Sequence, residues 1–511
     1  MTCAINYRFG TFEPQAIGED RMDHLGATEN GRVDFGAIVD GKSCPSATGA
    51  TIAMLAPSDG APFARIPRCD AADVGRAVVA GRKALEEGPW KSMSAVARGR
   101  ILSRLSALIL ENFEELSAIE ARDTGKPLRQ GRADITAAAR YFEFYGGAAD
   151  KVHGDTIPVQ EGFLALTLRE PHGVVGSIVP WNYPAQIMAR VAGAALAMGN
   201  TLVMKPAEQA CLSVIRIAEL ALDAGLPPGV WNVVTGYGEE AGAALANHPG
   251  LDFVTFTGSP EVGTLVQEAA ARNRIGCTLE LGGKSPQILF ADADLKAALP
   301  VIVNAIVQNC GQTCSAGSRL LVEEAIFGKL RDCLRDRFRA LVAGPHDRDL
   351  DLGALVSAEQ AARVEKYVKA ARDAGIPLIG EGSVAPDTPE GGFYTKARVF
   401  GPVPADAPLA QEEVFGPVLA IIPFADEAEA IRLANETEYG LVAGVWTADG
   451  QKAMRVARAV RSGQVFVNAY GAGGGVELPF GGMKKSGHGR EKGFEALFEF
   501  STLKTVVFNH G

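Results

Sequence analysis

Several features that identify particular protein classes are missing from this sequence. Its 511 residues include eight cysteines, and none of them forms a Cys-x-x-Cys pair. This low density does not build a disulfide framework, so we expect reduced thiols in a reducing compartment. No group of His, Cys and Asp has metal-ligand spacing, and the separation of Cys310 from Cys314 suits a zinc half-site poorly. The sequence therefore predicts no metal site.

Other absences concern nucleic acids and membranes. The formal net charge is −10, so there is no basic surplus to neutralise phosphates, and we expect no nucleic-acid partner. Residues 1–21 contain Glu13, Glu19 and Asp20 and no apolar core, which is unlike a signal peptide. The longest apolar stretch, 173–199, is interrupted by Asn182, Arg190 and two prolines, so it does not predict a membrane span. We expect a cytoplasmic protein without membrane partners.

What is present is a globular α/β pattern. The length suggests two to four domains at about 100 to 200 residues each. Residues 1–34 lack periodicity and are expected to form an extension. Apolar residues recur at helical spacing over 71–88, 94–125 and 134–148. A strand pair is predicted over 154–169, with Leu164, Leu166 and Leu168 on one face.

After residue 172, short apolar runs alternate with a helical segment. Strands are predicted at 174–179, 202–204, 231–234 and 253–256, with a helix at 211–224. Such alternation predicts a parallel, doubly wound sheet. A second series runs from 279 to about 475 and includes helices at 324–341 and 358–374. The boundary at 282–283 is predicted to be a turn.

Three residues are candidates for chemistry. Cys314 is flanked by small residues that leave room for a substrate, and a thiolate attacks carbonyl carbons well. Glu280 lies between two leucines, where burial would raise its pKa toward that of a general base. Asn182, between two prolines after a strand, has an amide that can donate to an oxyanion. Taken singly, each has an ordinary structural alternative: a buried thiol, a strand-end acid and a turn amide.

Two further segments suit a nucleotide. Lys205 and Glu208 follow a predicted strand and can reach ribose hydroxyls, although a solvated charge pair is the ordinary alternative. Ser259 follows Gly258 at a predicted helix start, where backbone N–H groups bind phosphate. This turn does not match the Gly-x-Gly-x-x-Gly pattern, so its spacing alone indicates little.

Together these segments resemble the NAD(P)-dependent aldehyde dehydrogenase superfamily. The resemblance extends from about residue 35 to the end of the chain, and seven stretches match in the family's order: 180–184, 205–209, 256–263, 279–286, 311–319, 412–418 and 479–491. Seven matches in register are far more specific than any single motif. The resemblance implies a doubly wound dinucleotide-binding domain, a second α/β catalytic domain and a small β oligomerisation element.

The resemblance implies a role for each matching residue. Cys314 would be the nucleophile, Glu280 the base that activates water, and Asn182 the oxyanion donor together with the Cys314 backbone N–H. Lys205 would belong to both the catalytic and the cofactor-binding groups. The cofactor would be NAD, with NADP as the alternative, because Glu208 would repel a 2′-phosphate. The residues expected to bind it are Ile178, Val179, Pro180, Trp181, Lys205, Glu208, Gly238, Phe256, Gly258, Ser259, Gly282, Glu413 and Phe415.

The substrate is less constrained. We expect the tunnel to be lined by Tyr183, Ile187, Arg190, Gln308, Thr313 and Ser315, with 471–475 in the same wall. Relatives that oxidise succinic semialdehyde share Arg190, but their second Arg is replaced here by Gln308 and their loop Ser falls in 473–475. Arg190 therefore has two explanations, an internal carboxylate partner or a substrate carboxylate, and a semialdehyde or another polar aldehyde is the expected substrate.

The expected domains are a dinucleotide-binding domain over 35–148 and 172–282, and a catalytic domain over 283–484. An oligomerisation element would cover 149–171 and 499–511, giving a homodimer or homotetramer. Two alternative functions remain: a CoA-acylating enzyme, whose family members usually lack a Glu at position 280, and a binding protein without turnover. The presence of Cys314, Asn182 and Glu280 favours the hydrolytic enzyme over both.

Overall fold

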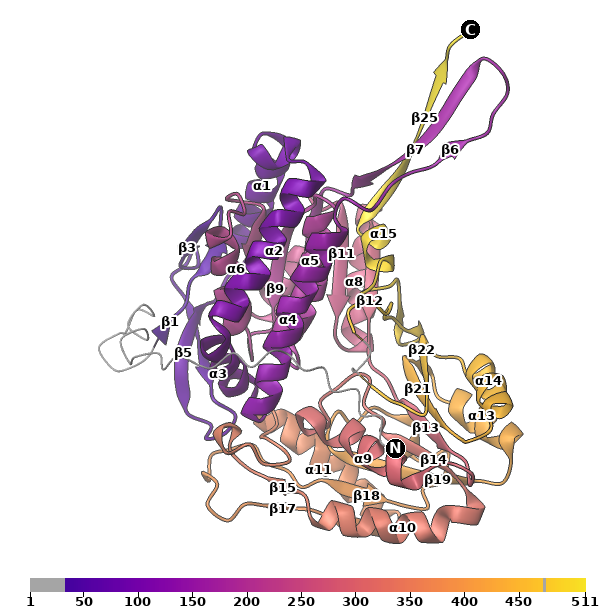
Figure 1. The fold of residues 1–511 in the computed structure, drawn as a ribbon. Helices are drawn as coiled ribbons and strands as arrows, with labels where there is room; N and C mark the ends of the chain where they lie inside the picture. Colours follow the sequence, from indigo (N-terminus) through magenta and orange to yellow (C-terminus); the bar gives the residue numbers. More distant parts are fainter. Residues whose placement is uncertain (1–32, 472–474) are drawn as a thin grey trace.

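The structure, a computed structural model, describes residues 33–471 and 475–511. The predicted extension at 1–34 therefore lies almost wholly outside the described residues. The chain forms two large α/β units, and a narrow arm of three strands projects from the body (Figure 1). The predicted α/β class is confirmed.

The first unit is built on an eight-stranded sheet. In spatial order its strands are β24 (Gly487–His488), β12 (Gly276–Glu280), β11 (Phe253–Thr257), β8 (Val174–Val179), β9 (Thr201–Pro206), β10 (Trp231–Val233), β2 (Ala37–Val39) and β3 (Lys42–Cys44). The five strands from β12 to β10 are parallel, and the other three pair antiparallel at the edges. From β8 the chain adds β9 and β10 on one side and then β11 and β12 on the other. This reversal beside β8 is the switch point of a doubly wound sheet, where ligands usually bind.

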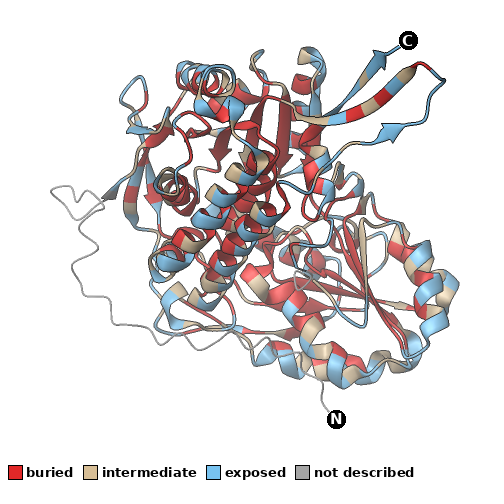
Figure 2. Cartoon of the chain, turned by 45° about the horizontal axis from the view of Figure 1, so that its top comes forward, coloured by how far each residue is buried: buried red, intermediate tan, exposed pale blue. Residues whose placement is uncertain are grey.

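Both faces of this sheet are buried. Neighbouring residues of a strand point to opposite faces, so one strand contributes side chains to two cores. In β9, Leu202 and Met204 join the core that contains α5 and α6, whereas Val203 packs with Val74 and Val78 of α1. The helices of this unit are α1 (Ala71–Glu86), α2 (Ala95–Glu111), α3 (Phe113–Thr124), α4 (Leu128–Ala148), α5 (Pro184–Ala197), α6 (Leu212–Asp223) and α8 (Pro260–Asn273). Figure 2 shows the buried strands enclosed by helices that are exposed only on their outer faces.

The predicted elements are confirmed at most positions, with two corrections. The helix expected over 94–125 is two helices, because Asn112 leaves helical geometry between α2 and α3. The helix expected from residue 134 begins earlier, at Leu128, directly after Pro127. Proline has no N–H to donate and is well suited to the start of a helix.

The second unit is built on a seven-stranded sheet. Its strands, in spatial order, are β16 (Leu378–Glu381), β18 (Arg398–Phe400), β19 (Val418–Phe424), β14 (Arg319–Glu323), β13 (Pro286–Leu289), β21 (Val442–Trp446) and β22 (Gln464–Val467). All neighbours are parallel except β16 and β18. The helices of this unit are α9 (Leu295–Val307), α10 (Glu324–Arg339), α11 (Ala358–Asp373), α13 (Glu427–Asn435) and α14 (Gly450–Ala459).

The projecting arm joins distant parts of the chain. Strand β7 (Phe163–Pro171) pairs antiparallel with β6 (Thr156–Ile157) and along its whole length with β25 (Ser501–Asn509). The predicted alternation is present, but the side that carries Leu164 and Leu168 is the exposed one. No layer formed by residues 33–471 and 475–511 covers these leucines, because the arm extends away from the body (Figure 1).

The remaining elements are short. They are β1 (Val33–Asp34), β4 (Thr51–Leu55), β5 (Pro62–Pro67), β15 (Val342–Ala343), β17 (Ser383–Val384), β20 (Tyr439–Gly440), β23 (Met483–Lys484), α7 (Ala243–Ala246), α12 (Pro408–Gln411) and α15 (Glu495–Glu499). Among the described residues, no helix is both long enough and apolar enough to cross a membrane.

Candidate active site

A cavity of about 740 Å³ contains the residues that were expected to line the substrate tunnel. Its walls include Cys314 together with Tyr183, Ile187, Arg190, Gln308, Thr313 and Ser315. They come from the start of α5 in the first unit and from the segment after α9 in the second. Gly471 also lines the cavity, whereas 472–474 of the predicted wall lie outside the described residues.

The segment that leads to Cys314 has an unusual backbone. After α9 ends at Val307, three successive residues have left-handed φ values: Asn309 at 47°, Cys310 at 54° and Gly311 at 73°. At Gly311 a Cβ atom would approach the carbonyl carbon of Gly416 to 2.2 Å, so only glycine fits. The turn returns the chain to the cavity, where Cys314 is half-buried. Burial raises the pKa of the Cys314 thiol to about 12, and the charge of Arg190 opposes that rise.

Asn182 lies against the cysteine segment. It follows β8, is almost fully buried, and its Nδ2 donates to the carbonyl of Gln312 at 3.0 Å. The next residue makes a second contact, since the Tyr183 hydroxyl and Thr313 Oγ1 are 2.8 Å apart. The predicted oxyanion donor is thus held within two residues of Cys314. An amide NH₂ has two hydrogens, so one remains for a substrate oxygen.

Glu280 ends β12 and is buried. Neither of its carboxyl oxygens has a hydrogen-bond partner within the described part of the chain. Burial and the charge of Glu491 raise the pKa of Glu280 well above its usual value, while the charges of Arg190 and Arg490 lower it. Glu280 also acts electrostatically on the Cys314 thiol, so the two groups lie in one environment. A buried carboxyl without partners is a proton acceptor of raised basicity.

Arg190 has an internal partner. Its guanidinium forms an ion pair with Glu491, whose Oε1 accepts a hydrogen bond from Thr255 at 3.2 Å. The guanidinium carbon lies 5.2 Å from the centre of the Phe480 ring, within cation–π range. Of the two explanations for Arg190, this contact favours the internal carboxylate. Pairing across about 300 positions has no local sequence signal, although Glu491 does close one of the matching stretches.

The expected cofactor residues gather at the carboxyl edge of the first sheet, near its switch point. At the end of β9, Lys205 Nζ is 2.8 Å from Glu208 Oε2. Ser259 caps α8 by accepting from the N–H of Val262 at 3.3 Å. A nucleotide site needs hydrogen-bonding groups for a ribose beside a helix N-terminus for phosphate, and these residues meet that requirement. Ile178, Val179 and Pro180 come from the end of β8 and the turn after it, and Phe256 comes from β11.

The second unit contributes the other side of this edge. Glu413 Oε1 accepts from the N–H of Gly283 at 2.9 Å, and burial raises the pKa of Glu413 to about 7. A Cβ at Gly282 would come within 2.3 Å of Glu413 Oε2, so glycine is needed for this approach. The Trp181 and Phe415 rings meet edge to face at 5.4 Å between centres, joining the two units. Gly238 has open space where a side chain would stand. The residues present therefore fit a dinucleotide.

Sequence reasoning missed several cavity residues. Tyr141 of α4, Phe466 of β22, and Phe480 and Lys492 near the end of the chain all line the cavity. They come from elements far apart in the sequence, and an aromatic residue on a helix or strand is more often core than site. Asp134 and Gln130 on α4 also reach the cavity, and neither lies in a matching stretch.

The comparisons with known proteins decide the family. The model of the aldehyde dehydrogenase family matches residues 44–506. The chain belongs to the aldehyde dehydrogenase family. This aldehyde dehydrogenase is an oxidoreductase that converts aldehydes to carboxylic acids with NAD, as the resemblance implied.

Solved structures and curated relatives agree with this assignment. A Burkholderia cenocepacia structure of the same family is 60% identical, with a TM-score of 0.92, covering 93% of this chain and 100% of its own. The NAD⁺ complex of a Bacillus cereus aldehyde dehydrogenase is 37% identical, with a TM-score of 0.93, covering 97% and 99%. A hydroxyisobutyraldehyde dehydrogenase of Mycolicibacterium austroafricanum is 42% identical, covering 92% of this aldehyde dehydrogenase and 93% of its own length.

Proposed function

We propose that this enzyme oxidises a polar aldehyde through a thioester on Cys314, with Asn182 as oxyanion donor and Glu280 as the base for hydrolysis. The observation that carries the proposal is the convergence of these groups. Cys314 reaches the cavity, and the Asn182 amide bonds to Gln312 beside it. Glu280 is buried without a partner in the described residues and acts electrostatically on the thiol.

The chemistry follows from these positions. The Cys314 thiol first gives its proton to water. Its sulfur then forms a C–S bond to the aldehyde carbon, and the carbonyl electron pair moves to oxygen. Asn182 Nδ2 and the Cys314 backbone N–H stabilise this oxyanion in a thiohemiacetal. The carbonyl then re-forms as hydride leaves the carbon, which gives a thioester. NAD, when bound, supplies the acceptor for this hydride. Water adds to the thioester carbon while Glu280 takes its proton, and C–S cleavage releases the acid and the thiolate.

The NAD site is proposed at the carboxyl edge of the first sheet. Lys205 and Glu208 would hold the adenosine ribose, Ser259 at the start of α8 would face the pyrophosphate, and Glu413 would hold the nicotinamide ribose. Lys205 also belongs to the catalytic group. The remaining residues proposed to surround NAD are Ile178, Val179, Pro180, Trp181, Gly238, Phe256, Gly258, Gly282 and Phe415. Because Glu208 would repel a 2′-phosphate, NAD is preferred over NADP.

The substrate is proposed to be an uncharged polar aldehyde. Phe466, Phe480 and Ile187 supply apolar walls, while Gln308, Thr313 and Asn304 supply hydrogen-bonding groups. The ion pair with Glu491 neutralises the Arg190 charge, which weakens the case for a semialdehyde carboxylate. The similar hydroxyisobutyraldehyde dehydrogenase is named for a hydroxylated aldehyde, which agrees with this class.

The domain and assembly predictions remain proposals. The first sheet supports a dinucleotide domain over 35–148 and 172–282, and the second a catalytic domain over 283–484. The arm over 149–171 and 499–511 is proposed to join subunits of a homodimer or homotetramer. Leu164, Leu503 and Val507 are exposed on it, and apolar surface of this kind is usually covered by a partner. A cytoplasmic location without nucleic-acid partners is part of the same proposal.

The experiment that tests this function compares two neighbouring thiols. Cys314→Ala should abolish NADH formation, whereas Cys310→Ala should retain most of it, because Cys310 is fully buried in the turn. NADH absorbance is followed with mixed aldehydes, with and without CoA. Equal losses in both variants would remove Cys314 as nucleophile, and a requirement for CoA would favour the acylating alternative. A wild-type protein without turnover on any aldehyde would favour the binding protein.

A further inference from the structure

The two segments of the proposed site belong to different units. Asn182 follows β8 in the first unit, and Cys314 follows α9 in the second. An oxyanion donor has to lie about 2.7–3.1 Å from the position of the oxyanion, so these segments must be held in register. Besides the direct bonds from Asn182 to Gln312 and from Tyr183 to Thr313, one further residue connects them. It is Asn309, which is five positions before Cys314 and almost fully buried.

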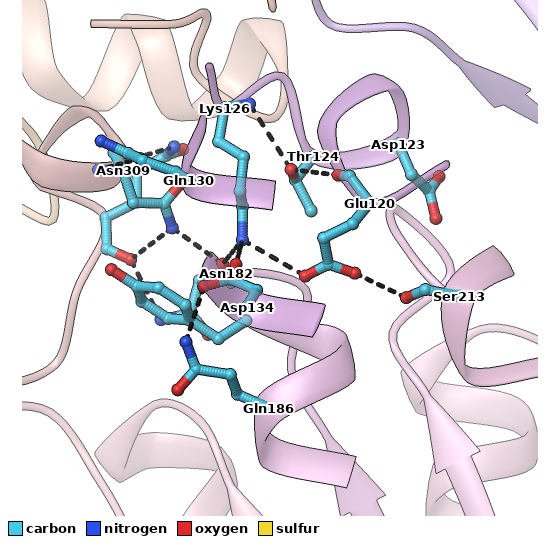
Figure 3. Close-up of polar contacts among 12 residues, drawn as sticks. Glu120, Asp123, Thr124, Lys126, Gln130, Asp134, Asn182, Gln186, Ser213 and Asn309 are labelled. Carbon is cyan, nitrogen blue, oxygen red and sulfur yellow. Dashed lines mark hydrogen bonds and ion pairs between the residues drawn. The ribbon is translucent and has the colours of Figure 1, made fainter. Parts of the chain in front are cut away.

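The Asn309 side chain bridges both segments. Its Nδ2 donates to the Asn182 carbonyl at 2.8 Å (Figure 3). The same Nδ2 donates to the Gln312 carbonyl at 3.2 Å. The Gln312 carbonyl in turn accepts from Asn182 Nδ2 at 3.0 Å. These bonds form a closed ring. The Asn309 amide holds the backbone carbonyl of Asn182, and the Asn182 amide is the proposed oxyanion donor. Movement of either segment would therefore break a bond in the ring.

Asn309 is itself fixed on several sides. Its backbone N–H donates to Gln130 Oε1 of α4 at 2.8 Å. Its carbonyl accepts from the backbone N–H of Gln312 at 3.0 Å and from Gln312 Nε2 at 3.1 Å. The left-handed φ of 47° is tolerated by asparagine better than by most residues. A backbone held in this conformation persists only where the surroundings determine it.

The Asn182 carbonyl has a second donor from the first unit. Lys126 Nζ, fully buried between α3 and α4, donates to it at 3.0 Å (Figure 3). Lys126 is held by Glu120 at 3.3 Å and by a short contact with Asp134. The Asn182 carbonyl therefore receives one donor from each unit, Lys126 from the first and Asn309 from the second.

We propose that Asn309 is a positioning residue that keeps the Asn182 amide in register with Cys314. The inference rests on the proposed function of those two residues. Without the bridge, the Asn182 and Gln312 carbonyls lose a donor and the two segments can shift relative to each other. A misplacement of about 1 Å commonly costs on the order of a hundredfold in rate. Asn309 need not touch the substrate for this effect.

Two substitutions remove the bridge in different ways. Asn309→Asp keeps the size but places an oxygen against two carbonyl oxygens. Asn309→Gly keeps the left-handed backbone and deletes the side chain, so either variant serves if the other fails to fold. The matched control is Asn200→Asp. Asn200 is equally buried, and its Nδ2 also spans two carbonyls, those of Ala195 and Phe500, at 3.0 and 2.8 Å.

We expect both Asn309 variants to lose about ten- to a hundredfold in kcat, with KM for NAD changed less than about threefold. Asn200→Asp should keep kcat within about threefold of the wild-type value, even where its melting temperature falls as much as that of the Asn309 variants. The double variant Asn182→Ala/Asn309→Asp should be no slower than Asn182→Ala alone, because the two residues act through one interaction.

Two results would overturn the inference. One is near-wild-type kcat in the Asn309 variants while Asn182→Ala is impaired. The other is a fully additive loss in the double variant, which indicates general damage. Failure of the proposed function itself looks different, since Cys314→Ala would then still turn over. These measurements therefore separate an incorrect role for Asn309 from an incorrect nucleophile.

Discussion

Two groups of buried charges each contribute one residue, Asp134 or Arg190, to the wall of the Cys314 cavity, and they differ in how completely their polar atoms are hydrogen-bonded. In the first, Lys126 contacts Glu120, Asp134 and the Asn182 carbonyl, and the outer carboxyl oxygens accept from Ser213 and Gln186, both at 2.6 Å (Figure 3). In the second group, Arg190 pairs with Glu491, while Glu280 has no hydrogen-bond partner in the described residues. The first group uses all three protons of its ammonium, and the second keeps an unsatisfied carboxyl.

This difference separates a structural role from a chemical one. Burial alone lowers the pKa of Lys126, but the charges of Asp134 and Glu120 outweigh it and hold the pKa above its usual value. That lysine stays charged and fixed. For Glu280 the largest effect, burial, raises the pKa, so this carboxyl binds a proton more strongly than an exposed glutamate does. We infer that the first group stabilises the site and that the second performs chemistry.

The largest expected effect comes from removing the unsatisfied carboxyl. Glu280→Gln should slow release of the acid by about a hundred- to ten-thousandfold, the usual contribution of a general base. Thioester formation does not need this base, so a first-turnover burst of NADH should remain. Stopped-flow absorbance separates the burst from the steady state. Gln has the same shape without the charge, so the melting temperature should stay close to that of the wild type.

The same carboxyl predicts a pH dependence. Glu280 accepts a proton only when ionised, and its pKa is raised, so the steady-state rate of the wild type should increase as pH rises through that pKa. This ascending limb should be absent from Glu280→Gln. A variant with wild-type turnover, or with the same ascending limb, would transfer water activation to another group.

In the fully hydrogen-bonded group of Lys126, Glu120 and Asp134, we expect a substitution to reduce stability. Lys126→Met leaves Glu120 and Asp134 as buried carboxyls without their cation, which typically costs about 3–5 kcal/mol of stability. The destabilisation should grow as pH rises, because both carboxyls are tolerated better when protonated. Thermal melts of the variant and the wild type across pH measure this effect.

The matched control removes the whole charge group. Glu120→Gln/Lys126→Met/Asp134→Asn leaves no buried charge, so it should recover much of the stability lost in Lys126→Met. A Lys126→Met protein as stable as the wild type would contradict the structural role. Together with Glu280→Gln, these variants test whether stability and chemistry are separated between the two groups.

The two groups also show what the sequence can and cannot predict. The strand at 174–179 was predicted with the bounds of β8, because a short apolar run ending at Pro180 has one simple explanation. Three of the six expected tunnel residues lie in the matching stretches and the other three lie within six positions of one, and all six line the cavity. Local patterns and matching stretches therefore identified residues that lie together in one wall of the cavity.

The remaining features depend on contacts between distant segments. Lys126 stands between Gly125 and Pro127, a setting typical of an exposed turn, yet its side chain is fully buried. Arg190 and Glu491 are too far apart in sequence for any periodicity to connect them. The break at Asn112 involves neither Gly nor Pro, and a single Asn within a helical pattern is a weak turn signal. Charge pairing and backbone geometry of this kind become visible only once the chain is folded.

The smallest expected effect concerns Arg190 and sharpens the comparison within the second group. Arg190→Leu leaves Glu491 unpaired beside Glu280, and the charge of Arg190 no longer lowers the pKa of either carboxyl. The higher pKa leaves a smaller fraction of Glu280 ionised near pH 7, so kcat there should fall, by less than it falls in Glu280→Gln. The loss should be parallel for succinic semialdehyde and butanal, and it should shrink as pH rises. Arg190→Leu/Glu491→Gln, which removes both charges, should recover part of it. A loss that is much larger with the semialdehyde, and independent of pH, would instead make Arg190 a ligand for the substrate carboxylate.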